Sequence, residues 1–133
     1  MKIYALAYLV TGLSFAALDA VWLSLMTSRL YRPALQSILA ERPQIAPAIA
    51  FYVLYILGLV IFAVAPGLAA GRWSAALWRG ALFGLFTYMT YDLTNQATLR
   101  VWSFGVTAAD LSWGMVASAI AATIGTAVVL ALH

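Results

Sequence analysis

The sequence predicts an all-α integral membrane protein, built as one bundle of four transmembrane helices over residues 1–133. Hydrophobic residues make up 65% of the 133-residue chain and charged residues only 8%, and the mean hydropathy is +0.98. A water-soluble domain of this length needs far more polar surface than that. About 20 helical residues cross a bilayer, so four spans and their loops nearly exhaust the chain, which we interpret as a single domain.

The first span is expected at residues 3–26. Lys2 and the apolar run behind it are also the pattern of a secretory signal peptide. The run is too long for a typical signal core, however, and no small-x-small cleavage site interrupts it. We therefore expect this segment to be retained as a transmembrane helix, because backbone polar groups in lipid must be satisfied within the segment.

The connection that follows, "TSRLYRPALQSILAERPQ", has two interpretations. Its apolar residues recur at near-helical spacing: Leu30, Tyr31, Leu35, Ile38 and Leu39. This pattern favours a short helix lying in the membrane interface, in a position to act as a lid. The alternative is a solvated connector whose leucines dip into the bilayer, and the pattern supports both equally.

Three further spans are expected at residues 47–64, 78–99 and 106–132. Pro47 suits the first turn of a helix, and Pro66-Gly67 predicts a stop. Gly80-x-x-x-Gly84 predicts close helix packing. Four spans place both termini on one side, but the arginines and lysine divide three against four between the two sides, so the positive-inside rule gives no orientation.

Composition excludes several kinds of site. The chain has no cysteine, and its single histidine, His133, is the last residue. Zinc, haem and histidine-based catalytic triads are therefore not expected. Interfacial arginines explain the net charge of +3 better than nucleic acid does. We expect no metal and no cofactor, since no Gly-rich phosphate loop is present, and the expected partner is membrane lipid.

Three of the four acidic residues are predicted to lie at one membrane depth. Counting along the helices puts Asp19, Asp92 and Asp110 each about 8–10 Å inside the same boundary. An ionised carboxylate in hydrocarbon costs several kcal/mol, so such residues usually face a cavity or the bundle interior. These aspartates are our candidate catalytic residues.

Polar and aromatic residues accompany the aspartates. In "YMTYDLTNQATLR" four residues at positions i, i+3, i+4 and i+7 form a stripe on one helix face: Tyr88, Tyr91, Asp92 and Asn95. Asp19-Ala-Val-Trp22 is echoed by Asp110-Leu-Ser-Trp113, and Trp102 is expected in the interfacial aromatic belt. The candidate ligand-binding residues at this depth are Trp22, Tyr52, Tyr55, Tyr88, Tyr91, Asn95 and Trp113.

The chemistry of this layer has three readings. The carboxyl groups could be neutral and donate hydrogen bonds to tyrosine or asparagine oxygens. They could instead bind a cation through carboxylate and amide oxygens. The third reading is interhelical glue, at about 1 kcal/mol for each bond.

Three segments carry a resemblance to a known family. "LDAVWL", "YDLTNQATL" and "DLSWG", in this order, resemble the domain of unknown function 2177 family of small bacterial membrane proteins. The resemblance covers nearly the whole chain. It implies a four-span, multi-pass protein of the bacterial inner membrane and assigns no activity to any residue.

Three functions follow as hypotheses. One is a pocket that binds, or modifies by acid/base chemistry, a lipid-like or isoprenoid-like ligand. Another is a proton- or cation-coupled transporter, which at 133 residues would have to act as an oligomer. The last is a non-catalytic accessory or assembly protein whose polar layer fixes the bundle. Whether the protein is an enzyme stays open at this stage.

Overall fold

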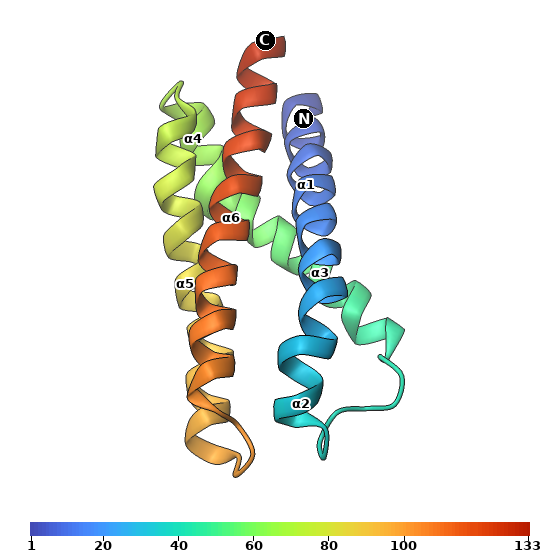
Figure 1. The fold of residues 1–133 in the computed structure, drawn as a ribbon. Coiled ribbons are helices and arrows are strands. Elements are labelled where there is room, and N and C mark those ends of the chain that lie inside the picture. The colour runs from blue at the N-terminus through green and yellow to red at the C-terminus, as the bar shows by residue number, and fades with distance from the viewer.

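The computed structural model describes all 133 residues and contains only helices. The first helical column runs through α1 (Lys2–Met26), the π-helical η1 (Thr27–Tyr31) and α2 (Arg32–Leu35). The second runs through α3 (Ile45–Leu59), the π-helical η2 (Val60–Val64) and α4 (Ala65–Ala69). The third and fourth columns are α5 (Trp73–Thr98) and α6 (Phe104–Leu132). The four long helices expected from the apolar runs are therefore present (Figure 1).

Three of these columns are long and apolar enough to cross a membrane. They are Lys2–Leu35, Ile45–Ala69 and Phe104–Leu132. The remaining helix, α5, is 26 residues long but is not among the helices that reach this apolarity. The chain thus has the character of a multi-pass membrane protein, with three spans supported by length and composition.

Two expectations about helix ends are wrong. The first loop holds no separate helix, because η1 and α2 continue α1 without a break to Leu35. Pro66-Gly67 does not end the second column either, which continues to Ala69. In both places a π-helical turn ends two residues before a proline, Pro33 or Pro66. A widened turn accommodates a residue that has no N–H to donate and whose ring would clash with the carbonyl four residues earlier.

The turn between α4 and α5 explains why α5 begins earlier than expected. Gly71 has a φ of +64°, a left-handed conformation that favours glycine. The chain reverses there and enters α5 at Trp73, five residues before the expected start. Trp73 and Trp78 are both about half exposed at this end, as expected of an aromatic belt.

The helix α6 is the centre of the bundle. It packs along α5 on one side and along α1 on the other, and the N- and C-termini lie at the same end (Figure 1). The helix α3 is tilted relative to α1 and packs against it, whereas contact with α5 is made mainly by η2 (Figure 1). The start of α3 therefore diverges from α5.

Glycines allow α5 and α6 to approach closely. A Cβ atom at Gly80 would stand 2.7 Å from the Ser118 carbonyl oxygen, and one at Gly84 would stand 2.1 Å from the Gly114 carbonyl oxygen. Both distances are too short for a real side chain, so the predicted close packing through Gly80-x-x-x-Gly84 is confirmed. Gly114 in turn leaves room for the ring of Tyr88, 2.3 Å from where its Cβ would be.

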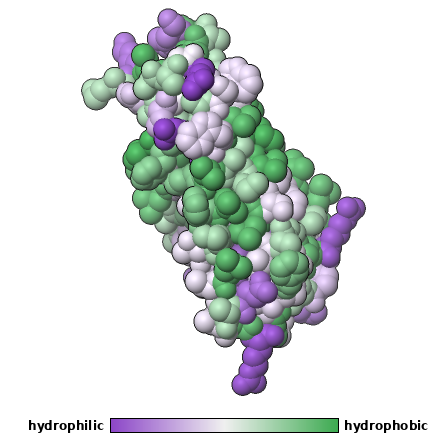
Figure 2. All heavy atoms as spheres, turned by 90° about the vertical axis from the view of Figure 1, so that its left-hand side faces the viewer, coloured by the Kyte–Doolittle hydropathy of each residue, from purple (hydrophilic) through white to green (hydrophobic).

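The outer surface is apolar. In Figure 2 hydrophobic residues fill the middle of the molecule, and hydrophilic residues gather toward its upper end and on its lower part. Large side chains such as Leu13, Leu54 and Phe62 are more than half exposed. The hydroxyls of Thr90, Thr94 and Thr98 on α5 bond to carbonyls of their own helix, which satisfies them without water.

Replacing Gly84 by alanine is expected to lower the stability of the bundle by about 1–3 kcal/mol, the usual cost of overpacking. The new methyl group would meet the Gly114 backbone, which cannot rotate away. Unfolding in mixed detergent measures the effect. In the control Gly105→Ala, the nearest atom is Ser103 Oγ at 3.8 Å, so no loss is expected. Equal stability of the two variants would contradict the close packing of α5 on α6.

Candidate functional site

Asp19 joins three helices through its two carboxylate oxygens. The Tyr52 hydroxyl, from α3, donates to Oδ2. The Trp113 indole, from α6, donates to Oδ1 at 3.0 Å. The Asp19 side chain is buried, with 7% of its surface exposed. Both acceptor oxygens are therefore engaged in bonds between helices, and both donors are neutral.

Asp110 on α6 is held by a two-step chain of donors. The Trp22 indole donates to the Tyr31 hydroxyl at 2.9 Å, and that hydroxyl donates to Asp110 Oδ1. The Trp22 and Trp113 rings stack, with centroids 4.7 Å apart and an interplanar angle of 4°. The two Asp-x-x-Trp segments thus engage each other crosswise, α1 to α6, with Tyr31 completing one of the two links.

Asp92 differs from the other two aspartates because its carboxyl group has no donor. The residue is fully buried, and neither side-chain oxygen has a hydrogen-bond partner. The Asp110 carboxyl group, on α6, lies close to it. Asp92 and Asp110 therefore form a carboxyl pair at the interface of α5 and α6.

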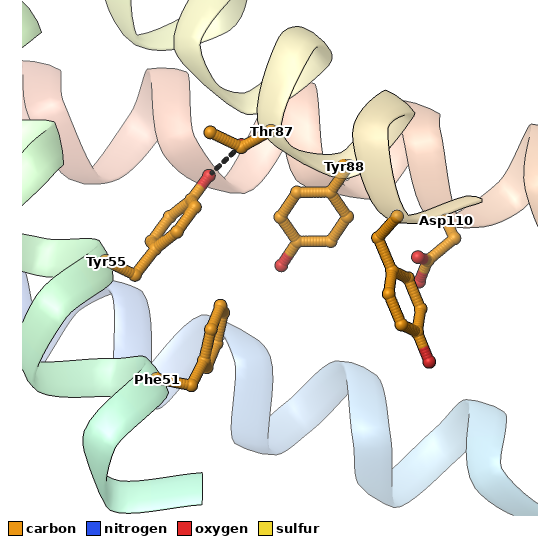
Figure 3. Close-up of a pocket in the computed structure, with 6 residues that line it drawn as sticks. Phe51, Tyr55, Thr87, Tyr88 and Asp110 are labelled. Atoms are coloured by element: carbon orange, nitrogen blue, oxygen red, sulfur yellow. Dashed lines mark hydrogen bonds between the residues drawn. The ribbon is translucent and has the colours of Figure 1, made fainter. Parts of the chain in front are cut away.

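A cavity of about 340 Å³ opens beside this pair, and we call it the outer cavity. In Figure 3 the side chains of α3 lie on one side of it and those of α5 on the other, with Asp110 at one end. The Tyr88 hydroxyl points into the open space, and the Tyr55 hydroxyl points to Thr87 Oγ1 at 3.2 Å (Figure 3). The lining residues are Phe51, Tyr55, Thr87, Tyr88, Tyr91 and Asp110.

A second cavity of about 250 Å³, the inner cavity, lies between the two Asp-x-x-Trp segments. It shares Tyr88, Tyr91 and Asp110 with the outer cavity, so the two are neighbours across these side chains. Leu35 and Leu39 also line it, from the end of the first column and the loop beyond. Its aromatic and acidic lining residues are Asp19, Trp22, Tyr31, Tyr88, Tyr91, Trp102, Asp110 and Trp113.

The structure gathers most of the residues chosen from the sequence. Seven of them line one cavity or both: Asp19, Trp22, Tyr55, Tyr88, Tyr91, Asp110 and Trp113. Tyr52 acts through its bond to Asp19 and lines neither cavity. Asp92 lies behind Asp110, and Asn95 is half-buried but lines neither cavity. The catalytic and ligand-binding roles of all these residues stay predictions.

Several lining residues were not predicted from the sequence. Tyr31 was placed in an interfacial segment, but the continuous first column carries it back to Asp110. Trp102 was expected in an interfacial belt, which stays a prediction; in the structure only 9% of it is exposed and its indole donates to Thr107 Oγ1 at 3.0 Å. Phe51 and Thr87 lie one helical turn from predicted residues, and turn counting along α3 and α5 is the signal that finds them.

The arrangement favours organic chemistry over metal chemistry. No three histidine, cysteine, aspartate or glutamate side chains lie close enough together to hold one metal ion. Both oxygens of Asp19 accept hydrogen bonds from other helices. Asp110 lies close to Asp92 and lines both cavities. Such a carboxyl group can bind or exchange a proton with a molecule in the outer cavity.

Comparison with known proteins gives one match. The model of a family described as predicted membrane protein (DUF2177) matches residues 4–127. No curated protein matches the chain. No solved structure matches it either.

Replacing Asp19 by alanine is expected to lower the free energy of unfolding by about 2 kcal/mol, because it leaves the Tyr52 hydroxyl and the Trp113 indole without their acceptor. Combining it with Tyr52→Phe in a double-mutant cycle should give a coupling of about 1 kcal/mol. Reversible unfolding in detergent measures both. Ser24→Ala is the control, since its exposed hydroxyl bonds only to Ala20 of its own helix. An Asp19→Ala protein as stable as the control would show that this aspartate does not hold the helices together.

Proposed function

We propose that this chain, which belongs to the DUF2177 family of predicted membrane proteins, binds an amphipathic ligand dissolved in the membrane. The observation that carries the proposal is the outer cavity, an aromatic space of about 340 Å³ with a carboxyl group at one end. Ligand sites are typically concave and mostly apolar, with a few well-placed polar groups, and start at about 300 Å³. An apolar chain fits its aromatic walls, and a polar end fits Asp110.

The proposal includes four membrane spans, with both termini on the same side of a bacterial inner membrane. The helix α6 is apolar enough to cross the bilayer, and α5 runs beside it over most of its length (Figure 1). The polar residues that lower the apolarity of α5 include Asp92, which is buried, and Thr87 and Tyr88, which face the cavity. Such residues do not have to meet lipid.

The proposed way in for the ligand is sideways, from the membrane. Phe51 on α3 and Tyr91 on α5 stand on opposite walls of the outer cavity and are 42% and 59% exposed. The helices that carry them diverge at this level, because the second column contacts α5 mainly through η2 and α4, beyond the end of α3. A hydrophobic molecule can enter between them without passing through water.

The three aspartates have different parts in this proposal. Asp19, with both oxygens bonded, fixes α1, α3 and α6 in place. Asp110 is the residue that meets the ligand, and Asp92 is the buried acid beside it on α5. A carboxyl pair of this kind supplies general acid/base chemistry to a bound polar group. Chemical modification of the ligand is therefore a second part of the proposal, after binding.

Filling the outer cavity is expected to remove the ligand. The substitution Thr87→Phe places a ring where the ligand would lie, and Thr90→Phe is the matched control. Both threonine hydroxyls bond to the carbonyl four residues earlier at 2.7 Å, but Thr87 lines the cavity and Thr90 is exposed on the outside.

The measurement is mass spectrometry of the small molecules that remain with the protein after detergent purification. Thr87→Phe should reduce the retained amphiphile by about tenfold or more, equivalent to at least about 1.4 kcal/mol of lost binding free energy. Thr90→Phe should retain as much as the unaltered protein. Equal retention by both variants, or no amphiphile above the detergent background in any of the three proteins, would contradict the proposal.

A further inference from the structure

The inner cavity has an electrostatic character that the outer cavity shares only at Asp110. Two of its lining residues, Asp19 and Asp110, are acids, and Asp92 lies directly behind Asp110. No lysine, arginine or histidine lines it. The nearby arginines Arg29, Arg32 and Arg100 are exposed and line neither cavity.

The hydrogen bonds to these acids leave their negative charge uncompensated. Every donor to Asp19 and Asp110 is a tyrosine hydroxyl or an indole, which are neutral. None of these donors brings a positive charge into the layer. Charges held away from water without a counter-charge are costly, and a bound cation would offset that cost.

The fully buried carboxyl group of Asp92 is a second, independent sign that polar groups in this region are not balanced. Both of its oxygens lack a partner, although buried polar groups in proteins are nearly always hydrogen-bonded. Asp110, which lies close to it, is also an acid and lines the inner cavity. The region therefore has acceptors in excess and lacks donors or positive charge.

The walls of the inner cavity select the kind of cation. Three tryptophans line it, and two of them, Trp22 and Trp113, are stacked. Aromatic rings attract organic ammonium groups within about 6 Å of the ring centre, and aromatic cages that hold quaternary ammonium groups use this attraction. A bare metal ion is a poor fit, because no three potential ligands of acid, histidine or cysteine type converge. A phosphate or carboxylate would find no basic partner among the lining residues.

We propose that the inner cavity receives the alkylammonium head group of a cationic amphiphile whose apolar chain lies in the outer cavity. The two cavities share Tyr88, Tyr91 and Asp110 in their lining, and the proposal places one molecule across these side chains. Asp19 and Asp110 supply the charge, and Trp22, Trp102 and Trp113 supply the aromatic surfaces. This inference rests on the proposed function, since it names the chemical class of the ligand that the outer cavity binds.

The test compares three pyrene-labelled amphiphiles of equal chain length in nanodiscs of uncharged lipid. One ends in a trimethylammonium group, one in an alcohol and one in a carboxylate. Energy transfer from the tryptophans to pyrene reports binding. The trimethylammonium probe is expected to bind about tenfold or more tightly than the alcohol, the scale of a desolvated cation–π contact with an added ion pair. The carboxylate probe should bind most weakly.

Charge variants then locate the preference. Asp110→Asn should bring the trimethylammonium probe to within about threefold of the alcohol, a remaining difference of the size expected from the aromatic walls alone. Glu41→Gln removes the same charge from the exposed loop and should leave the full preference intact. Binding of the alcohol probe serves as the internal check that Asp110→Asn retains its cavity.

Each outcome separates the two proposals. Equal binding of the trimethylammonium and alcohol probes to the unaltered protein overturns the cationic head group and leaves the amphiphile site standing. The cationic head group is also overturned, with the amphiphile site left standing, if Asp110→Asn keeps the full preference for the trimethylammonium probe or if the carboxylate probe binds best. Failure of all three probes to bind the unaltered protein overturns both proposals. If Asp110→Asn loses alcohol binding as well, Asp19→Asn takes its place, and an unchanged preference in that variant also overturns the inference.

Discussion

The bundle depends on how it accommodates carboxyl groups in an apolar environment without basic side chains beside them. Asp19 accepts from Tyr52 and Trp113, and Asp110 accepts from Tyr31. Tyrosine and tryptophan suit this task because each combines a large apolar surface with one polar donor. The same bonds connect α1 to α3 and α6, and bring the end of the first column back onto α6. The hydrogen bonds that satisfy these acids are therefore also contacts that hold the helices together.

Close packing of α5 on α6 adds the unusual element, the carboxyl group without a donor. Gly80 and Gly84 let the two helices approach to backbone contact. This approach buries Asp92 between them and puts it within reach of Asp110. Gly114 makes room for the Tyr88 ring, which stands at the junction of the two cavities. Backbone packing thus determines both where the Asp92 carboxyl group is buried and where space remains beside it.

Helical rise alone predicted one region for Asp19, Asp92 and Asp110, and their common membrane depth stays a prediction. In the structure Asp19 and Asp110 line the inner cavity, and Asp92 is buried without lining it. The sequence could not distinguish Asp92 from Asn95, which lies on the same stripe of α5. Asp92 is fully buried, whereas Asn95 is half-buried. That distinction depends on how α5 is rotated against α6, which is decided by contacts of Gly80 and Gly84 with residues far along the chain, such as Ser118 and Gly114.

The residues that sequence reasoning missed have local causes. Tyr31 follows an apolar span and precedes Pro33, a pattern typical of a helix end. A π-helical turn absorbs the proline instead, and the helix carries Tyr31 to Asp110. Trp102 lies in a short loop, where hydropathy says nothing about burial. Its indole reaches Thr107 and its ring packs beside Tyr91, and only the path of the loop determines this.

The central claim is that the space between α3, α5 and α6 holds a membrane-dissolved molecule whose polar end reaches Asp110. An experimental structure in a nanodisc made from native lipid extract tests it most directly. The account predicts elongated density that enters between Phe51 and Tyr91, passes Tyr88 and ends beside Asp110 under the stacked Trp22 and Trp113. A bundle in which α3 closes onto α5, with side chains filling the outer cavity and no density beside Asp110, would contradict it.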